Sequence, residues 1–254
     1  MPNLCETIRE KLKVGGTFTL QCVGDSVTQG TNHCRPEETY TAKLASCFAE
    51  KFKEACVMRY DGRVKGEMLP LDGFDGPILV RFGEVGCVNV IRNGVGGNTV
   101  ERLMNRADDF TGEVAGFRPD ITTVMCGIND ALSEDPKKYV TDAVFKENYR
   151  RLIGMIQKEN PDTEIVLLTP SYNDSGDSSE SRLDPYCARV HELAKEYGLG
   201  FIDVHALWMN HLEVGGEHYG QGGWLSDCKG DMCHPSPEGA EMTARFIFEE
   251  LMKL

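Results

Sequence analysis

The stretch FTLQCVGDSVTQG, residues 18–30, contains the pattern that decides the fold. Its first part, Phe18 to Val23, is a short apolar run typical of a buried strand, and a Gly-Asp-Ser turn follows it directly. Comparable runs, each ending in polar or glycine-rich residues, recur at Val88–Arg92, Ile121–Cys126, Ile165–Thr169 and Phe201–Val204. Because helical periodicity fills the intervals, the pattern predicts an α/β fold built on a parallel sheet.

Amphipathic helices are expected to cover this sheet. Two stripes of apolar residues recur at steps of three and four, which is the spacing of one helix face. The stripes consist of Tyr40, Leu44, Cys47, Phe48 and Phe52, and of Phe145, Tyr149, Leu152, Ile153 and Ile156. A last helix is predicted to begin after Ser236, a typical N-cap residue, with Pro237 at its first position.

The segment from Cys56 to Cys87 does not fit the alternation of strands and helices. It contains Asp61-Gly62 and further glycines between the short β-prone pieces VMRY and ILVRF, which is typical of hairpins. We therefore expect a β-ribbon insertion at about 56–87 within a single domain that spans residues 1–254.

Composition narrows the possible partners. The 254 residues are 41% hydrophobic and 26% charged, as in globular proteins, and the net charge of -13 argues against binding to nucleic acid or to anionic membranes. No apolar stretch approaches the roughly 18 residues of a membrane span, and the N-terminus lacks the pattern of a signal peptide. The expectation is a cytoplasmic protein, or a secreted one if a signal peptide has been removed.

The ten cysteines are scattered along the chain. Several, including Cys22 and Cys126, lie in apolar runs, where a free thiol behaves as a small buried hydrophobic group. Cys228 and Cys233 are the exception, because they lie close together in a polar loop. A disulfide between these two remains open, and two free thiols are the simpler expectation.

Ser26 is the candidate nucleophile. A serine between small residues at a strand-to-helix turn can present its hydroxyl above the sheet, while its backbone N–H points into the same space. An isolated Gly-Asp-Ser is also typical of a helix cap, formed by Ser26 or Asp25.

The segment DMCHP supplies a base for that serine. Asp231 precedes His234 by three residues, a spacing that lets the carboxylate hold one imidazole nitrogen while the other faces the serine. The alternative is a loop histidine packed near the start of a helix.

Two further segments offer donors for a tetrahedral oxyanion. The glycines of NGVGGNT, residues 93–99, permit close approach of a backbone N–H, for which Gly97 is the best candidate. GIND, residues 127–130, offers the side-chain amide of Asn129. Read singly, both are ordinary turn residues. Together with Ser26, Asp231 and His234 they complete a hydrolytic site.

The blocks GDSVTQG, NGVGGNT, GIND and DMCHP resemble those of the SGNH (GDSL-like) hydrolases, in the same order from Gly24 to Pro235. The resemblance implies a flavodoxin-like three-layer α/β/α sandwich with five parallel core strands. It implies a carboxylic ester hydrolase with Ser26, Asp231 and His234 as the catalytic triad and with Ser26, Gly97 and Asn129 as the oxyanion hole. It implies neither metal nor cofactor. One departure is Arg92, because many members have an asparagine two residues before the first glycine of the second block.

The resemblance leaves the substrate open. Aromatic residues in the region before DMCHP could stack on sugars, and no long apolar lid is evident. We therefore expect a small ester substrate, foremost an acylated carbohydrate with a short acyl group such as acetyl, and a lysophospholipase or thioesterase is the runner-up. Candidate contacts to substrate are Asp25, Trp208 and Trp224, and the alternative is that the tryptophans cover the core. Nothing in the sequence indicates oligomeric state.

Three rival interpretations differ in class. A flavodoxin-like sheet could bind a phosphate or flavin without catalysis, but Asp25 would repel a phosphate and no Gly-rich Lys-Ser/Thr loop is present. A metal protein would draw on His205, His211, His218, Cys228, Cys233 and His234, whose spacings match no recognised zinc pattern. The third, an inactive relative, conflicts with the intact set of blocks.

Overall fold

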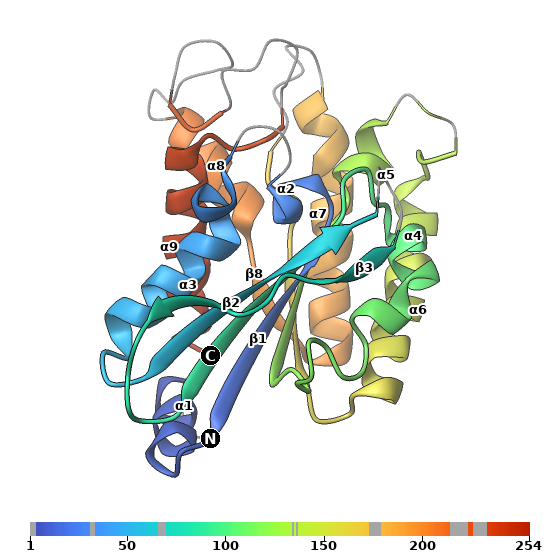
Figure 1. Ribbon diagram of the computed structural model, residues 1–254. Helices are drawn as coiled ribbons and strands as arrows, with labels where there is room; N and C mark the ends of the chain where they lie inside the picture. Colours follow the sequence, from blue (N-terminus) through green and yellow to red (C-terminus); the bar gives the residue numbers. More distant parts are fainter. Residues whose placement is uncertain are drawn as a thin grey trace.

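The computed structural model describes residues 4–30, 34–65, 70–133, 135, 137–172, 179–213, 223–225 and 233–254. A central sheet lies between two layers of helices (Figure 1). Within these residues the sheet has eight strands in the order β3-β2-β5-β1-β6-β7-β8, with β4 paired to β2. The strands are β1 (Thr17–Gly24), β2 (Cys56–Val64), β3 (Leu71–Phe74), β4 (Ile78–Arg81), β5 (Cys87–Gly94), β6 (Ile121–Met125), β7 (Glu164–Leu168) and β8 (Gly200–Ile202).

The five expected core strands are present and confirm the α/β fold. They are β5, β1, β6, β7 and β8, and each pairs with its neighbour in parallel. The chain passes from β1 to β5 on one side and then to β6 on the other. The carboxyl ends of these strands therefore flank a topological switch point, where open α/β sheets bind their ligands.

The segment expected as a β-ribbon insertion divides into two parts. β2 pairs in parallel with β5 from Cys56↔Cys87 to Asp61↔Arg92, so it extends the parallel sheet by a further strand. β3 and β4 pair with β2 in antiparallel fashion, as a ribbon would. Half-buried and buried residues alternate along β2, which is also the pattern of a strand in a β-ribbon. The sequence therefore did not distinguish a ribbon strand from a further strand of the parallel sheet.

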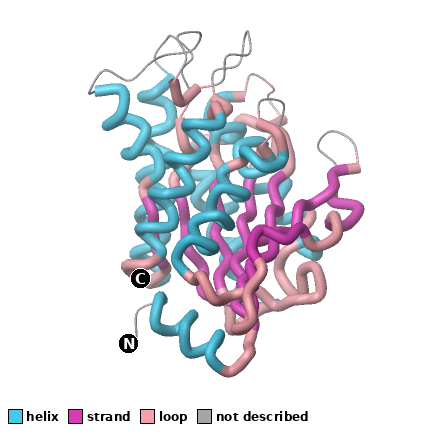
Figure 2. The backbone as a smooth tube through the Cα atoms, turned by 60° about the vertical axis from the view of Figure 1, so that its left-hand side comes forward, coloured by secondary structure: helices cyan, strands magenta, loops and turns pink. Residues whose placement is uncertain are grey.

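Helices cover both faces of the sheet (Figure 2). One layer contains α1 (Leu4–Lys13), α3 (Tyr40–Lys51), α8 (Val204–Glu213) and α9 (Pro237–Leu251), and the other contains α4 (Val100–Asn105), α5 (Ile128–Leu132), α6 (Asp142–Glu159) and α7 (Ser179–Tyr197). The shorter pieces are α2 (Ser26–Gln29) and the 3-10 turns η1 (Pro36–Glu38) and η2 (Ala107–Asp109). The last helix begins as expected, since the Ser236 side chain accepts a hydrogen bond from the Gly239 N–H.

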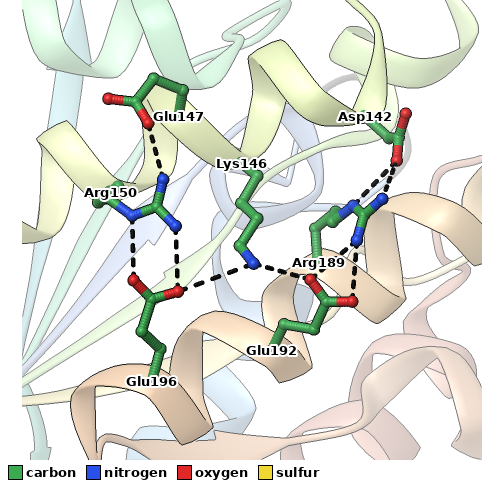
Figure 3. A network of polar contacts seen from close by, with 7 residues as sticks. All are labelled: Asp142, Lys146, Glu147, Arg150, Arg189, Glu192 and Glu196. Atoms are coloured by element: carbon green, nitrogen blue, oxygen red, sulfur yellow. Dashed lines mark hydrogen bonds and ion pairs between the residues drawn. The ribbon is translucent and has the colours of Figure 1, made fainter.

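Helices α6 and α7 are joined at the surface by a network of ion pairs (Figure 3). Arg150 contacts Glu196 through two nitrogens, at 3.0 and 3.2 Å. Arg189 bonds Asp142 at 2.8 Å and Lys146 bonds Glu192 at 2.8 Å. The side chains are part-exposed, so each pair adds little stability and the network chiefly fixes how the two helices lie.

No helix in the described ranges has the length and apolar character needed to span a membrane.

Candidate active site

Ser26 is held on a tight turn at the carboxyl end of β1. Asp25 caps α2 by accepting a hydrogen bond from the Val27 N–H at 3.0 Å, and Ser26 is the first residue of that helix. A Cβ at Gly24 would lie 2.2 Å from Thr28 Oγ1 and 2.4 Å from the Met125 carbonyl, so only glycine fits there. The turn leaves Ser26 half-buried, at the sheet edge beside the topological switch point.

The loop after β5 is bonded to this turn. The Val95 N–H donates to the Gly24 carbonyl at 3.2 Å, and the Gly96 N–H donates to Gln29 Oε1 at 2.6 Å. Gly97 follows with a φ of 71°, in the left-handed region that favours glycine. The second sequence block is thereby fixed against the helical turn that carries Ser26.

The third block is tied to the second in turn. Asn129, in the first turn of α5, donates from its side-chain amide to the Asn98 carbonyl at 2.9 Å. The Asp130 carboxyl accepts from the Val100 N–H at 3.2 and 3.3 Å. The structure therefore brings the segments of Ser26, Gly97 and Asn129 together at one sheet edge.

His234 reaches the same place from the far end of the chain. Ser26 and His234 line one cavity of about 10 Å³, together with Val27, Gly30, Cys34, Thr39, Tyr40, Pro235 and Ala240. Around His234, the Cys34 thiol donates to the Pro235 carbonyl at 3.4 Å and the Ser236 N–H donates to the Trp224 carbonyl at 2.7 Å. These bonds join the two residues that follow His234 to Cys34, which lines the same cavity, and to Trp224.

Two residues that the sequence assigned to this loop lie outside the described residues. They are Asp231 and Cys228. The orienting carboxylate therefore remains a prediction, and the choice between two free thiols and a Cys228–Cys233 disulfide stays open. The Cys233 thiol itself lies 3.7 Å from His234 Nδ1.

Two buried carboxyl groups, those of Asp25 and Asp130, belong to the segments that form the candidate site. Burial raises the pKa of Asp25 to about 6, against the opposing effects of the Val27 N–H and of His234. Burial also raises the pKa of Asp130 to about 7, where the Val100 N–H opposes the shift and the charge of Asp25 adds to it. Asp25 is 2% exposed, so its position gives it a structural role in α2, and its predicted contact with substrate remains a proposal.

Arg92, the departure in the second block, has a definite place. Its guanidinium donates to the carbonyl of Gln29 at the end of α2 and lies 3.3 Å from Asp61 Oδ2. Asp61 also lies 3.1 Å from Arg59 Nε. Sequence reasoning did not assign Gln29 a role, because a lone amide inside the first block carries no signature of its own. The structure makes it the link between α2 and the loop of Gly97.

The two tryptophans lie in the core. Trp208 is 1% exposed and donates from its indole nitrogen to Thr243 Oγ1 at 3.2 Å. Trp224 is 8% exposed and meets Trp208 edge to face, with 5.4 Å between ring centroids. Neither ring offers an open face to a sugar, which favours the alternative expectation that they cover the core.

The family model of the GDSL-like Lipase/Acylhydrolase family matches residues 78–242, well over half of the chain. The chain belongs to this family. As a GDSL-like acylhydrolase it is a carboxylic ester hydrolase, and the reading as a non-catalytic binding protein falls away. The match includes the segments of Gly97, Asn129 and His234 and begins after the segment of Ser26.

Solved structures share the acylhydrolase fold. Axe2, an acetylxylan esterase from Geobacillus stearothermophilus, is 22% identical with a TM-score of 0.63, covering 94% of this chain and 96% of its own. LAE5, an α/β hydrolase from the metagenome of Lake Arreo in Spain, is 20% identical with a TM-score of 0.65, covering 92% and 94%. The acetyl xylan esterase AlAXEase is 18% identical with a TM-score of 0.61, covering 91% and 98%. Among curated proteins, no sequence matches this chain.

Proposed function

We propose that this acylhydrolase is a serine esterase that removes acetyl or similarly short acyl groups from carbohydrates. The observation that carries the proposal is the shared cavity, which Ser26 and His234 line from opposite ends of the chain. A nucleophile needs a base within reach of its proton, and a histidine that lines the same cavity supports this role for His234.

The reaction follows the chemistry of these groups. His234 takes the proton of the Ser26 hydroxyl as the serine oxygen attacks the ester carbonyl, and it returns that proton to the leaving alcohol. Asp231 orients the imidazole and stabilises its charged form. Water then attacks the acyl-serine while His234 takes its proton, and His234 returns that proton to the Ser26 oxygen as the carboxylic acid leaves.

Three donors are proposed for the oxyanion. They are the backbone N–H groups of Ser26 and Gly97 and the side-chain amide of Asn129. An amide carries two N–H donors, so Asn129 can hold the Asn98 carbonyl with one and offer the other to the oxyanion. The hydrogen bonds among the three segments support this role, because donors that are held in position before substrate arrives stabilise an oxyanion most strongly.

The small cavity that Ser26 and His234 line is consistent with a short acyl group, and the two structural neighbours named as acetylxylan esterases support the same acyl group. A volume of about 10 Å³ is close to the space of one water molecule. Val27 and Tyr40, which both line it, are buried. The proposal of a carbohydrate substrate is supported by the structural neighbours, two of which are named as acetylxylan esterases. A lysophospholipase or thioesterase activity is the runner-up.

The test is hydrolysis of p-nitrophenyl esters from acetate to palmitate by wild type, Ser26→Ala and Asp231→Asn. Wild type should prefer acetate, and Ser26→Ala should lose at least about a thousandfold in kcat. Ser46→Ala, a half-buried serine in α3, is the matched control and should match wild type. Comparable rates on acetate and palmitate would reject the short acyl group, and an active Ser26→Ala would reject the serine mechanism.

A further inference from the structure

Two cysteines of the central sheet lie directly opposite each other. Cys56 is the first residue of β2 and Cys87 is the first residue of β5, and the parallel ladder makes them register partners. Neighbouring strands lie about 4.7–4.9 Å apart. That spacing falls within the Cα separations of roughly 4.4–6.8 Å that disulfides span.

The two thiols interact and are open to small reagents. Burial and a hydrogen bond to the Cys56 side chain are the leading causes that raise the pKa of Cys87 to about 11. Both residues are half-buried, unlike Cys22 and Cys126, which lie wholly in the core. Of the cysteines in sheet strands, this pair is therefore the one that a soluble oxidant can reach.

The surroundings favour thiol chemistry over metal binding at this pair. In the part of the chain that the structure describes, no group of three or more His, Cys, Asp and Glu residues is arranged to hold a metal ion. A structural zinc or iron–sulfur site would need four ligands. Two adjacent thiols alone can instead exchange two electrons between dithiol and disulfide.

We propose that Cys56 and Cys87 form a reversible dithiol–disulfide site, with hydrogen peroxide as an oxidant that drives it. Because the raised pKa of Cys87 disfavours its thiolate, we assign the attack to Cys56. The Cys56 thiolate attacks a peroxide oxygen, which breaks the O–O bond and leaves a sulfenic acid and hydroxide, and the proton released from the Cys56 thiol converts the hydroxide to water. The sulfur of the second cysteine then attacks the sulfenic sulfur. An S–S bond forms and a second water leaves. Overall, two thiols and one peroxide give one disulfide and two waters.

The bond would close residues 56–87 into a covalent loop. It would join β2 to β5 at their first residues, whereas Asp61 and Arg92 pair these strands near the Ser26 end. Cross-linking a loop of this span restricts the unfolded chain, so the oxidised protein should have a Tm higher by roughly 3–8 °C. The site is separate from the ester hydrolysis chemistry and does not rest on it.

Trypsin gives a direct readout of the bond. Cleavage isolates Cys56 in the peptide 54–59 and Cys87 in the peptide 82–92, each without another cysteine. The folded, full-length chain is treated with hydrogen peroxide, remaining thiols are blocked with N-ethylmaleimide, and the digest is analysed without reductant. We expect the two peptides to be found linked and to separate after dithiothreitol.

Two variants make the result specific. The linked peptide should vanish in Cys56→Ser and persist in Cys187→Ser, a half-buried cysteine of α7. Detection of the linked peptides in wild type tests the proposal even if Cys56→Ser folds poorly. The proposal is overturned if both peptides carry N-ethylmaleimide after a dose of peroxide that fully oxidises an added dithiol, or if either cysteine is found linked elsewhere.

Discussion

Ser26 owes its position to neighbours that lack side chains. A Cβ at Gly24 would collide with Thr28 Oγ1, and a Cβ at Gly94 would lie 2.2 Å from the Gln29 N–H nitrogen. The backbone of β5 therefore approaches α2 more closely than any other residue would allow. At the scale of single residues, the cavity beside Ser26 has a volume of about 10 Å³, and Val27 and Tyr40 are among the residues that line it.

The variant Val27→Ala should widen the range of acyl groups. It removes two methyl groups from the cavity wall, and one methylene in an apolar pocket is worth about 10–200-fold in discrimination. The ratio of kcat/KM for p-nitrophenyl butyrate over acetate should rise about tenfold. Val88→Ala is the matched control, because Val88 is equally buried but lies outside the cavity lining. An unchanged ratio in Val27→Ala would show that the acyl group binds elsewhere.

The sequence offered candidate residues for the site, but it did not offer the contacts that hold them in position. Ser26, Gly97, Asn129 and His234 stand in short blocks whose chemistry is legible from residue type and spacing. Gln29 has no such signature, because its role depends on a contact with the Gly96 N–H that only the folded chain creates.

At the scale of elements, Gln29 connects α2 to β5 and to the loop that follows β5 through two hydrogen bonds. Its side chain accepts from the Gly96 N–H at 2.6 Å, and its carbonyl accepts from Arg92 of β5. Helix α2 is thereby held to both the strand and the loop that follows it. Ser26 begins this helix and Gly97 follows Gly96 in the loop, so we expect the distance between Ser26 and Gly97 to depend on the contacts of Gln29.

Replacing Gln29 by alanine should lower kcat more than it changes KM. Loss of the acceptor loosens the loop of Gly97 relative to Ser26, and small misplacements of this kind cost roughly tenfold to a hundredfold in rate. Gln29→Glu keeps an acceptor oxygen for the Gly96 N–H and should retain most of the activity. Equal loss in both variants, or none in Gln29→Ala, would refute the positioning role.

The predictable part of the fold at this scale was the alternation of strands and helices. All five apolar runs became parallel strands, and Ser236 capped α9 as its type suggests. The exception was β2, whose half-buried residues alternate as in a hairpin. Its parallel partner β5 comes more than 20 residues later in the sequence, and local pattern does not encode such a pairing.

For the molecule as a whole, charge is distributed unevenly between surface and interior. The surface carries networks such as that of α6 and α7 (Figure 3), in which the hydrogen bonds that Arg150 donates lower the pKa of Glu196. The interior holds Asp25 and Asp130, whose pKa values burial raises to about 6 and about 7. A buried acid of raised pKa binds its proton more tightly in the folded state than in the unfolded state.

The free energy of unfolding should therefore fall as the pH rises from about 4 to about 7. The contribution of Asp130 is fully present below its unfolded pKa and is lost as the pH passes its folded pKa. In Asp130→Asn this loss is absent. Between pH 4 and pH 7 the free energy of unfolding of the variant should therefore rise relative to that of wild type by up to about 4 kcal/mol. Urea titrations at several pH values measure it, with the exposed Glu113→Gln as control. Parallel pH curves for wild type and Asp130→Asn would contradict the account.

The central claim is that Ser26 is the nucleophile of this esterase, and covalent labelling tests it most directly. Diethyl p-nitrophenyl phosphate transfers its phosphoryl group to an activated serine and releases p-nitrophenol. We expect one equivalent of p-nitrophenol per chain, with the added mass on the peptide that contains Ser26 and no release from His234→Ala. Slow release without a covalent adduct, or an adduct on any other residue, would contradict the assignment.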